Sequence, residues 1–212
     1  MKNFNLKLSA LVSALAIMTL APSANAAEQT DITASVEVAN SFDMAATAQL
    51  SFGTISAFWD DSGDGTGVQA TLSIPSNPGS EITAASTDDT AAKIISIVDG
   101  TPATIEITGA APNTALTVTT PAVPIAVSNV DPTITDTFNI SALTTYATTT
   151  GGSAFGNIID ATNKTFETDD SGNLTFNLGA TLQTQAPADD SGTLQAYGDG
   201  TYQATVTVVV DY

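Results

Sequence analysis

The sequence GTYQATVTVVVDY, residues 200–212, decides the fold because its side chains alternate with a period of two. Val206, Val208 and Val210 fall on one side of an extended chain, and threonines fill most of the other. β-Branched residues favour strands because the branch at Cβ packs well on a pleated surface. Residues 208–210 are three consecutive valines, which indicates a strand covered on both faces, so we expect it near the centre of a sheet.

The same alternation recurs along the chain in short segments. The expected strands are residues 31–40, 47–55, 68–75, 91–98, 103–109, 114–120, 123–129, 135–143, 173–185 and 201–211. Gly, Pro, Asn and Asp cluster between them, as in DDSGN at 169–173, because turns need their backbone geometry. No amphipathic helix is predicted, and residues 142–165 have the least regular pattern. We therefore expect an all-β fold: a single-domain antiparallel β-sandwich of immunoglobulin-like or pilin-like type.

The amino-terminal residues have the pattern of a secretory signal peptide. Lys2 and Lys7 precede an apolar run from Leu8 to Ala21, and Ala24-Asn25-Ala26 supplies the small residues of a cleavage site after Ala26. The alternative is a membrane anchor, but the apolar run is shorter than the roughly 20 residues that span a bilayer. We expect export to the periplasm, the cell surface or the extracellular space, with no membrane insertion after cleavage.

The exported chain is strongly acidic. After cleavage, residues 27–212 hold two lysines, no arginine and 22 Asp and Glu residues, which is a net charge of −20. Such a surface repels phosphate groups, so we expect no nucleic-acid partner. The chain has no cysteine and therefore no disulfide, so packing and backbone pairing must hold the fold.

The composition also argues against catalysis. The chain has no histidine and no cysteine, which removes the usual nucleophile pairs and imidazole metal ligands. Paired aspartates, as in glycosidases, stay open as an alternative because Asp is abundant. Most Asp residues lie in turn sequences, however, so we predict that the protein is not an enzyme and has no catalytic residues or bound cofactor.

One loop could bind calcium. In DDSGDGTG, residues 60–67, oxygen-bearing side chains fall at alternate positions as Asp60, Ser62 and Asp64, and Gly65 follows. This matches the first half of a calcium-binding loop, whereas the acidic residue that closes such a loop is missing. Phe58 and Trp59 precede the loop, so a second hypothesis is an adhesin-like module that binds a glycan, with or without calcium, through residues 58–66. The alternative to calcium binding is a hairpin loop with acidic residues at its tip. The alternative to glycan binding is that the Phe58 and Trp59 rings are buried in the sandwich.

The sequence DITASVEVANSFDM, residues 31–44, is a candidate donor strand for a neighbouring subunit. Its apolar side chains, Ile32, Ala34, Val36 and Val38, fall on one face and would fill alternate pockets of an accepting sheet. The alternative is that this strand pairs within its own sheet, since sequential strands are usually neighbours. We divide the chain into a signal peptide (1–26), an amino-terminal strand or extension (27–46) and a β-sandwich domain (47–212).

Three segments together resemble a bacterial exported family called domain of unknown function 4402. They are LSFGTIS (50–56), AAKIISIVDGTPATIEITGAAPNTALTVT (91–119) and the carboxy-terminal residues 178–212, and the resemblance extends over about residues 30–212. More distantly, the pattern resembles fimbrial and spore-coat-protein-U-like β-sandwiches, although the final Tyr212 and the lack of a cysteine pair depart from fimbrial subunits. The resemblance implies a non-enzymatic structural protein that associates with itself or with other surface-fibre subunits by strand exchange.

Overall fold

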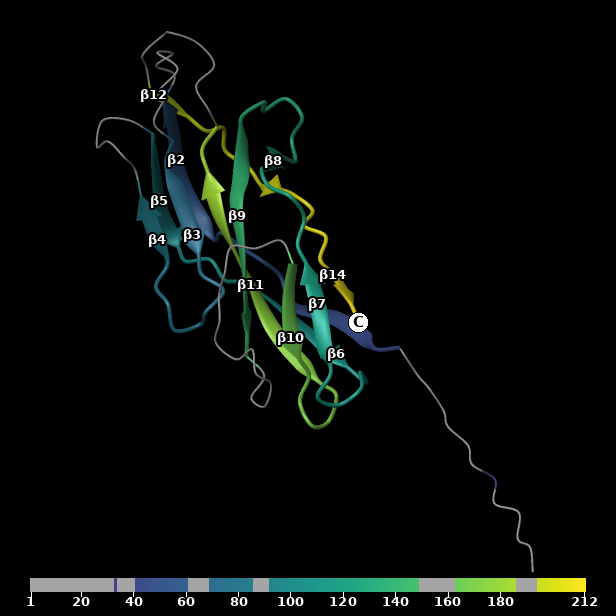
Figure 1. Ribbon diagram of the computed structural model, residues 1–212. Helices are drawn as coiled ribbons and strands as arrows, with labels where there is room; N and C mark the ends of the chain where they lie inside the picture. Colours follow the sequence, from purple (N-terminus) through teal and green to yellow (C-terminus); the bar gives the residue numbers. More distant parts are fainter. Residues whose placement is uncertain (1–32, 34–40, 61–68, 86–91, 149–162, 186–193) are drawn as a thin grey trace, which may run out of the picture. The chain divides into compact units, whose positions relative to one another are not determined.

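The computed structural model describes residues 33, 41–60, 69–85, 92–148, 163–185 and 194–212 (Figure 1). The chain divides into two compact units, residues 1–38 and residues 39–212, and the fold below is that of the second unit. The predicted signal peptide, residues 1–26, and the predicted strand at 31–40 lie outside the described residues, apart from Thr33. Within the described part of the chain, no helix is long and apolar enough to cross a membrane.

All regular elements of the described residues are strands, and all their pairings are antiparallel. The strands are β1 (Asp43–Ala48), β2 (Thr54–Asp60), β3 (Thr71–Ile74), β4 (Thr83–Ala85), β5 (Lys93–Val98), β6 (Ala103–Thr108), β7 (Ala115–Thr119), β8 (Ile125–Asn129), β9 (Thr137–Ala147), β10 (Asn163–Glu167), β11 (Leu174–Gln183), β12 (Leu194–Ala196), β13 (Tyr202–Gln203) and β14 (Val209–Asp211). The predicted all-β antiparallel fold is confirmed.

The largest sheet is built around β11, which is paired along both edges. Its strand order is β1-β6-β11-β9-β8-β13, and β3 with β4 joins the same edge of β11 as β6. Gly179 lies opposite the end of β3, and a Cβ at this position would collide with backbone atoms of Ile74 and Ser76. Glycine therefore allows the chain that leaves β3 to pass close to the backbone of β11.

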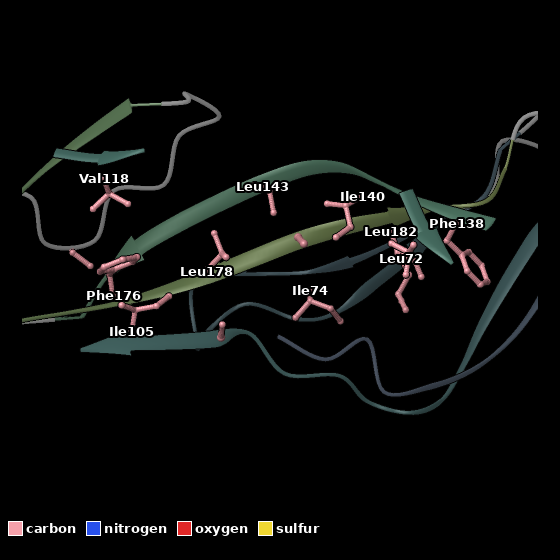
Figure 2. Close-up of a cluster of buried hydrophobic side chains, with 14 of the residues drawn as sticks. Leu72, Ile74, Ile105, Val118, Phe138, Ile140, Leu143, Phe176, Leu178 and Leu182 are labelled. Carbon is pink, nitrogen blue, oxygen red and sulfur yellow. The ribbon is translucent and has the colours of Figure 1, made fainter. Parts of the chain in front are cut away.

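The core follows from the period-two alternation of the central strands. In β6, Ile105 and Ile107 are buried and Glu106 between them is exposed, as the sequence pattern predicts. The buried set joins side chains from several strands, and Figure 2 shows them gathered around β9 and β11. They include Leu72, Ile74, Val118, Phe138, Ile140, Leu143, Phe176, Leu178 and Leu182.

Two three-stranded sheets pack against this core, with the orders β10-β7-β14 and β12-β2-β5. The ring of Phe166 on β10 stacks on Phe176 of β11 with centroids 5.7 Å apart, which joins the first small sheet to the large one. Ala57 of β2 and Ile94 of β5 belong to the same buried cluster, which joins the second small sheet to the large one. Sheets packed face to face through alternating side chains form a sandwich, so this part of the prediction is also confirmed.

Aspartates shape the turns that the structure describes. Asp169 opens the predicted DDSGN turn, and its Oδ1 accepts a hydrogen bond of 2.8 Å from the Asn173 amide. Asp131 accepts bonds from the amide and hydroxyl of Thr133, at 2.9 and 2.8 Å, and these bonds hold the pKa of the Asp131 carboxyl below its ordinary value. These carboxylates serve backbone geometry, in agreement with the turn interpretation of the acidic sequence clusters.

Three strand boundaries differ from the sequence-based expectation. The strand expected at 47–55 is instead the end of β1 and the start of β2, separated by Gly53, whose φ is 76°. A Cβ on Gly53 would collide with the Val98 carbonyl oxygen, so the turn needs glycine there. Within 142–165, β9 continues to Ala147 and β10 begins at Asn163. The short strands β4 and β12 had no sequence signal that we recognised.

The third difference concerns the carboxy-terminal strand. Residues 201–211 were expected to form one central strand, but within the described part of the chain only β13 and β14 are paired, and β14 is an edge strand of a three-stranded sheet. Val209 is 53% exposed, so the three consecutive valines are not covered on both faces. The placement of this strand at the centre of a sheet was wrong.

Candidate functional site

The chain between β13 and β14 is extended but has no partner strand within the described residues. β13 pairs with β8 and β14 pairs with β7, whereas no backbone pairing is described for Ala204–Val208. Val206 and Val208 are half-buried against the core, and Thr205 and Thr207, which alternate with them, are exposed. Five residues therefore have strand-like alternation, and no other described strand pairs with their backbone donors and acceptors.

β1 has an open edge of the same kind. β1 pairs with β6 along one edge, and in the described part of the chain no strand pairs with the other. Met44 and Ala46 lie opposite Ile107 and Ile105 of β6, so they share the face that looks toward the core. Met44 nevertheless remains 46% exposed. The core-facing side of β1 therefore offers an apolar side chain that the described strands leave about half exposed.

A groove of about 1020 Å³ lies between these two open edges. Met44 and Ala46 of β1 line it, as do Ala204, Val206 and Val208. The continuous run Gln49–Phe58, which leads from β1 into β2, also lines it. Its floor comes from the central strands and consists of apolar core residues. These are Ala103, Ile105, Val127, Phe138, Ile140, Leu178 and Leu182, of which Phe138, Ile140, Leu178 and Leu182 are visible in Figure 2. The groove therefore reaches the hydrophobic core, although its floor side chains are themselves buried.

A contact between two aromatic rings marks one end of the groove. The ring of Phe42, just before β1, packs edge-on against Tyr212 with centroids 5.5 Å apart. Neither ring lines the groove, and neither does Val210, so the groove stops short of this contact. The start of β1 and the end of the carboxy-terminal strand thus meet beyond this end of the groove.

The opposite end is held by a hydrogen-bonded aromatic cluster. Tyr197 stacks on Phe138 with centroids 3.9 Å apart, and Tyr202 meets Phe138 edge-on at 5.1 Å. The Tyr197 hydroxyl donates to the Thr137 carbonyl at 3.1 Å and accepts from the Gln185 amide at 2.7 Å. Burial raises the pKa of the Tyr197 phenol above its ordinary value. These bonds fix the residues around the Tyr197 end of the groove before any partner binds.

The glycines of the sequence YGDGTY allow the chain to turn at this end. Gly200 has a φ of 150°, and a Cβ on it would lie 2.6 Å from the side-chain nitrogen of Asn129. Tyr202 donates a hydrogen bond of 2.9 Å back to the Gly198 carbonyl, and the Gly198 amide donates to Asp136 at 3.0 Å. The turn directs the chain into the extended segment that begins at Ala204.

The groove has little charge. Among the described residues that line it, Asp199 is the only charged side chain, and the others are apolar, hydroxyl, amide or glycine residues. Such a lining favours an apolar guest that pairs through its backbone, and it offers neither a nucleophile with a base nor a cluster of metal ligands. No group of three or more acidic, His or Cys residues capable of holding a metal occurs among the described residues.

The calcium hypothesis falls mainly outside the described residues. Ser62 and Asp64 lie in the 61–68 stretch that is not described, and Asp60 is placed only as the last residue of β2. Phe58 and Trp59 project to opposite faces of β2: Phe58 lines the groove, whereas Trp59 is 9% exposed. The Trp59 ring is therefore buried and is not offered to a glycan together with Phe58.

The donor-strand residues Ile32, Ala34, Val36 and Val38 also lie outside the described residues. Sequence reasoning missed the accepting site. Met44 was assigned to the end of the donor sequence 31–44, and Ala46 to the extension 27–46, whereas the structure pairs both residues with β6 of the same chain. Val206 and Val208 were assigned only to a strand. The only sequence signal for the accepting site was the alternation of apolar and polar residues near both ends of the chain.

The chain matches no family model, no curated protein and no solved structure. Its resemblance to domain of unknown function 4402 stays a prediction. The fold and the groove define the class of protein that can be stated directly: an antiparallel β-sandwich with a groove that reaches buried core residues, between two strand edges that no other described strand pairs with.

Proposed function

We propose that this protein is a non-enzymatic structural subunit, exported to the cell surface or beyond, that assembles with other copies by β-strand exchange. The observation that carries the proposal is the unpaired segment Ala204–Val208 beside a groove that reaches the core. An added strand would pair with backbone groups that no described strand satisfies, and it would cover exposed apolar side chains of the groove such as Met44 and Ile97. Backbone pairing and apolar burial together give affinity without any catalytic group.

The occupant is the segment 31–38 of a neighbouring copy. Ile32, Ala34, Val36 and Val38 recur with a period of two, so one face of this strand is apolar and would lie on the apolar floor. The seven residues from Ile32 to Val38 span about 23 Å when extended, and the unpaired segment 204–208 spans about 17 Å. The donor is therefore long enough to pair along the whole open segment.

The resemblance to exported and fimbrial-type sandwiches and the predicted signal peptide support the same assignment. A protein that leaves the cytoplasm with no cysteine cannot use disulfides to hold subunits together. Strand exchange joins subunits through main-chain hydrogen bonds instead. The acidic surface also suits a protein that stays soluble until a specific contact forms.

The test compares two substitutions on β1 in the mature protein, residues 27–212. Met44→Lys places a charge in the groove, whereas Ala45→Lys places the same charge on the other face of β1 beside Glu106. Both positions are exposed, so both variants should fold. Electron microscopy and size-exclusion chromatography should show chains of subunits for the parent and Ala45→Lys and monomers for Met44→Lys. A parent that stays strictly monomeric at high concentration would overturn the proposal.

A further inference from the structure

One edge of the sheet β12-β2-β5 presents apolar side chains to solvent. β5 pairs with β2 along one edge, and no other strand of the described residues pairs with its second edge. Ile95, Ile97 and Val98 of β5 are 43%, 64% and 58% exposed, whereas soluble proteins usually place charged residues on an open strand edge. β4 passes close to β5 without pairing with it and leaves these three side chains exposed.

A bulge in β5 extends this apolar surface. The register between β5 and β2 shifts at Ile97, which is an extra residue with no partner of its own in β2. A bulge changes the direction of the side chains around it, because two residues of one strand then lie opposite one residue of the other. Ile97 and Val98 are consecutive, and both are nevertheless exposed. The second half of β5 therefore carries apolar side chains at successive positions.

The charged residues of this segment lie at its two ends and have opposite signs. The segment KIISIVD, residues 93–99, begins with Lys93 and ends with Asp99, and both side chains are exposed. The Ser96 hydroxyl donates a hydrogen bond of 3.2 Å to Oδ1 of Asp99. Lys93 lies opposite Phe58 of β2, so its neighbour across the strand pair carries no charge. The segment is therefore complementary in charge to a second copy of itself that runs in the reverse direction.

We propose that β5 is a second self-association surface, at which the segments 93–99 of two copies lie antiparallel about a two-fold axis near Ser96. In this arrangement Lys93 of each copy meets Asp99 of the other, and the exposed isoleucines and valine pack together between the two charge pairs. Both charge pairs form at once because the two segments are identical in length. A parallel arrangement would instead bring like charges together at both ends. The contact is isologous and closes as a dimer.

The composition of the segment supports a second copy as the partner. Residues 93–98 have high β-propensity, low net charge and neither glycine nor proline, which is typical of segments that pair with identical segments. The predicted mature chain has a net charge of −20, so two copies repel each other in most orientations. Lys93 is one of the two lysines in that chain, and it gives this edge a positive charge that an approaching copy can meet.

The test reverses these charges in the mature protein that carries Met44→Lys, which is the background in which strand exchange is blocked. Sedimentation equilibrium of the background should show monomers at about 10 µM and a dimer near about 1 mM, because so small a contact is weak. Lys93→Glu and Asp99→Lys each place like charges at both ends of the contact, so each should weaken dimerisation at least about tenfold. An equimolar mixture of the two variants should form a mixed dimer. The doubly reversed variant, Lys93→Glu with Asp99→Lys, should dimerise like the background.

The Asp99→Lys variant separates this contact from the effect of net charge. It lowers the negative charge of the chain, so general repulsion alone predicts tighter dimerisation, whereas the β5 contact predicts weaker dimerisation. Dimerisation of Asp99→Lys equal to that of the background would overturn the proposal, as would a mixture without a mixed dimer or a background that stays monomeric at the highest concentration. Thermal unfolding checks the fold of each variant. Fibres of the parent beside a monomeric background refute only the β5 contact, whereas dimers of the background without parent fibres refute only strand exchange.

Discussion

The substitution Ile97→Thr tests whether the groove accepts an apolar strand, and Val98→Thr is its matched control. Both residues lie at the end of β5, and they are 64% and 58% exposed. Only Ile97 lines the groove. Each substitution keeps a β-branched side chain, and because both positions are mainly solvent-exposed, both should have a similarly small effect on folding.

The size of the effect follows from the exposed fraction of Ile97. Complete burial of an isoleucine side chain is worth about 1.5 to 3 kcal/mol, so covering its exposed part contributes about 1 to 2 kcal/mol. Because 1.4 kcal/mol corresponds to a tenfold change, Ile97→Thr should weaken the association of subunits by about 5- to 30-fold. Val98→Thr should leave association unchanged within about twofold, because that side chain lies outside the groove.

Sedimentation velocity over a concentration series measures the association constant of each variant, and thermal unfolding of dilute protein checks the fold. The reasoning is refuted if the two variants weaken association equally, because a general loss of surface hydrophobicity would then explain the result. It is also refuted if Ile97→Thr assembles like the parent.

Three further predictions follow from the donor strand, the charge and the buried tyrosine. Val36→Asp should weaken association at least about 100-fold because it places a carboxylate on the apolar floor. Ser35→Asp, one residue away on the outward face, should change association by less than about threefold. Equal losses in a sedimentation assay would contradict the assigned donor face. Assembly followed by light scattering should be at least about tenfold faster at 150 mM than at 10 mM NaCl. The reason is that the predicted mature chain has a net charge of −20, and salt screens the repulsion between copies. An assembly rate that falls with salt would argue against charge repulsion as the barrier to association. The raised pKa of Tyr197 means that the folded state disfavours the ionised phenol. The stability that Tyr197 contributes is therefore constant below about pH 10 and declines as the pH rises above that value. Chemical unfolding from pH 8 to 11 should show this decline in the parent, and an equal decline in Tyr197→Phe would mean that another group causes it.

The parts of the fold that could be predicted from the sequence are those governed by local rules. The alternation of Ile105 and Ile107 about Glu106 gave the buried face of β6, and Asp169 marked a turn, because both depend on neighbouring residues. Gly53 could not be assigned to a turn between two strands, because the need for glycine arises from the distant Val98 carbonyl. Contacts between residues far apart in sequence leave no local period to detect.

The carboxy-terminal strand illustrates the same limit for the candidate site. Alternation correctly indicated that Val206 and Val208 face the core, but it could not show that the backbone between β13 and β14 lacks a partner among the described residues. Whether this segment is paired depends on which strand lies beside it. That depends in turn on the residues of β1 and of the groove floor, which are distant in the sequence. The donor residues Ile32 to Val38 stay a sequence-based prediction, supported by the shape and lining of the groove.

Hydrogen exchange at Ala204–Val208 tests the central claim most directly. In the Met44→Lys variant, which should stay monomeric, these five amides should exchange rapidly because no strand pairs with them. In assembled parent protein, the amides that face the groove should exchange at least about 100-fold more slowly, whereas amides of the central strand β11 should be protected equally in both samples. Equal exchange at Ala204–Val208 in the monomer and the assembly would contradict the account, because it would mean that no strand is added at the groove.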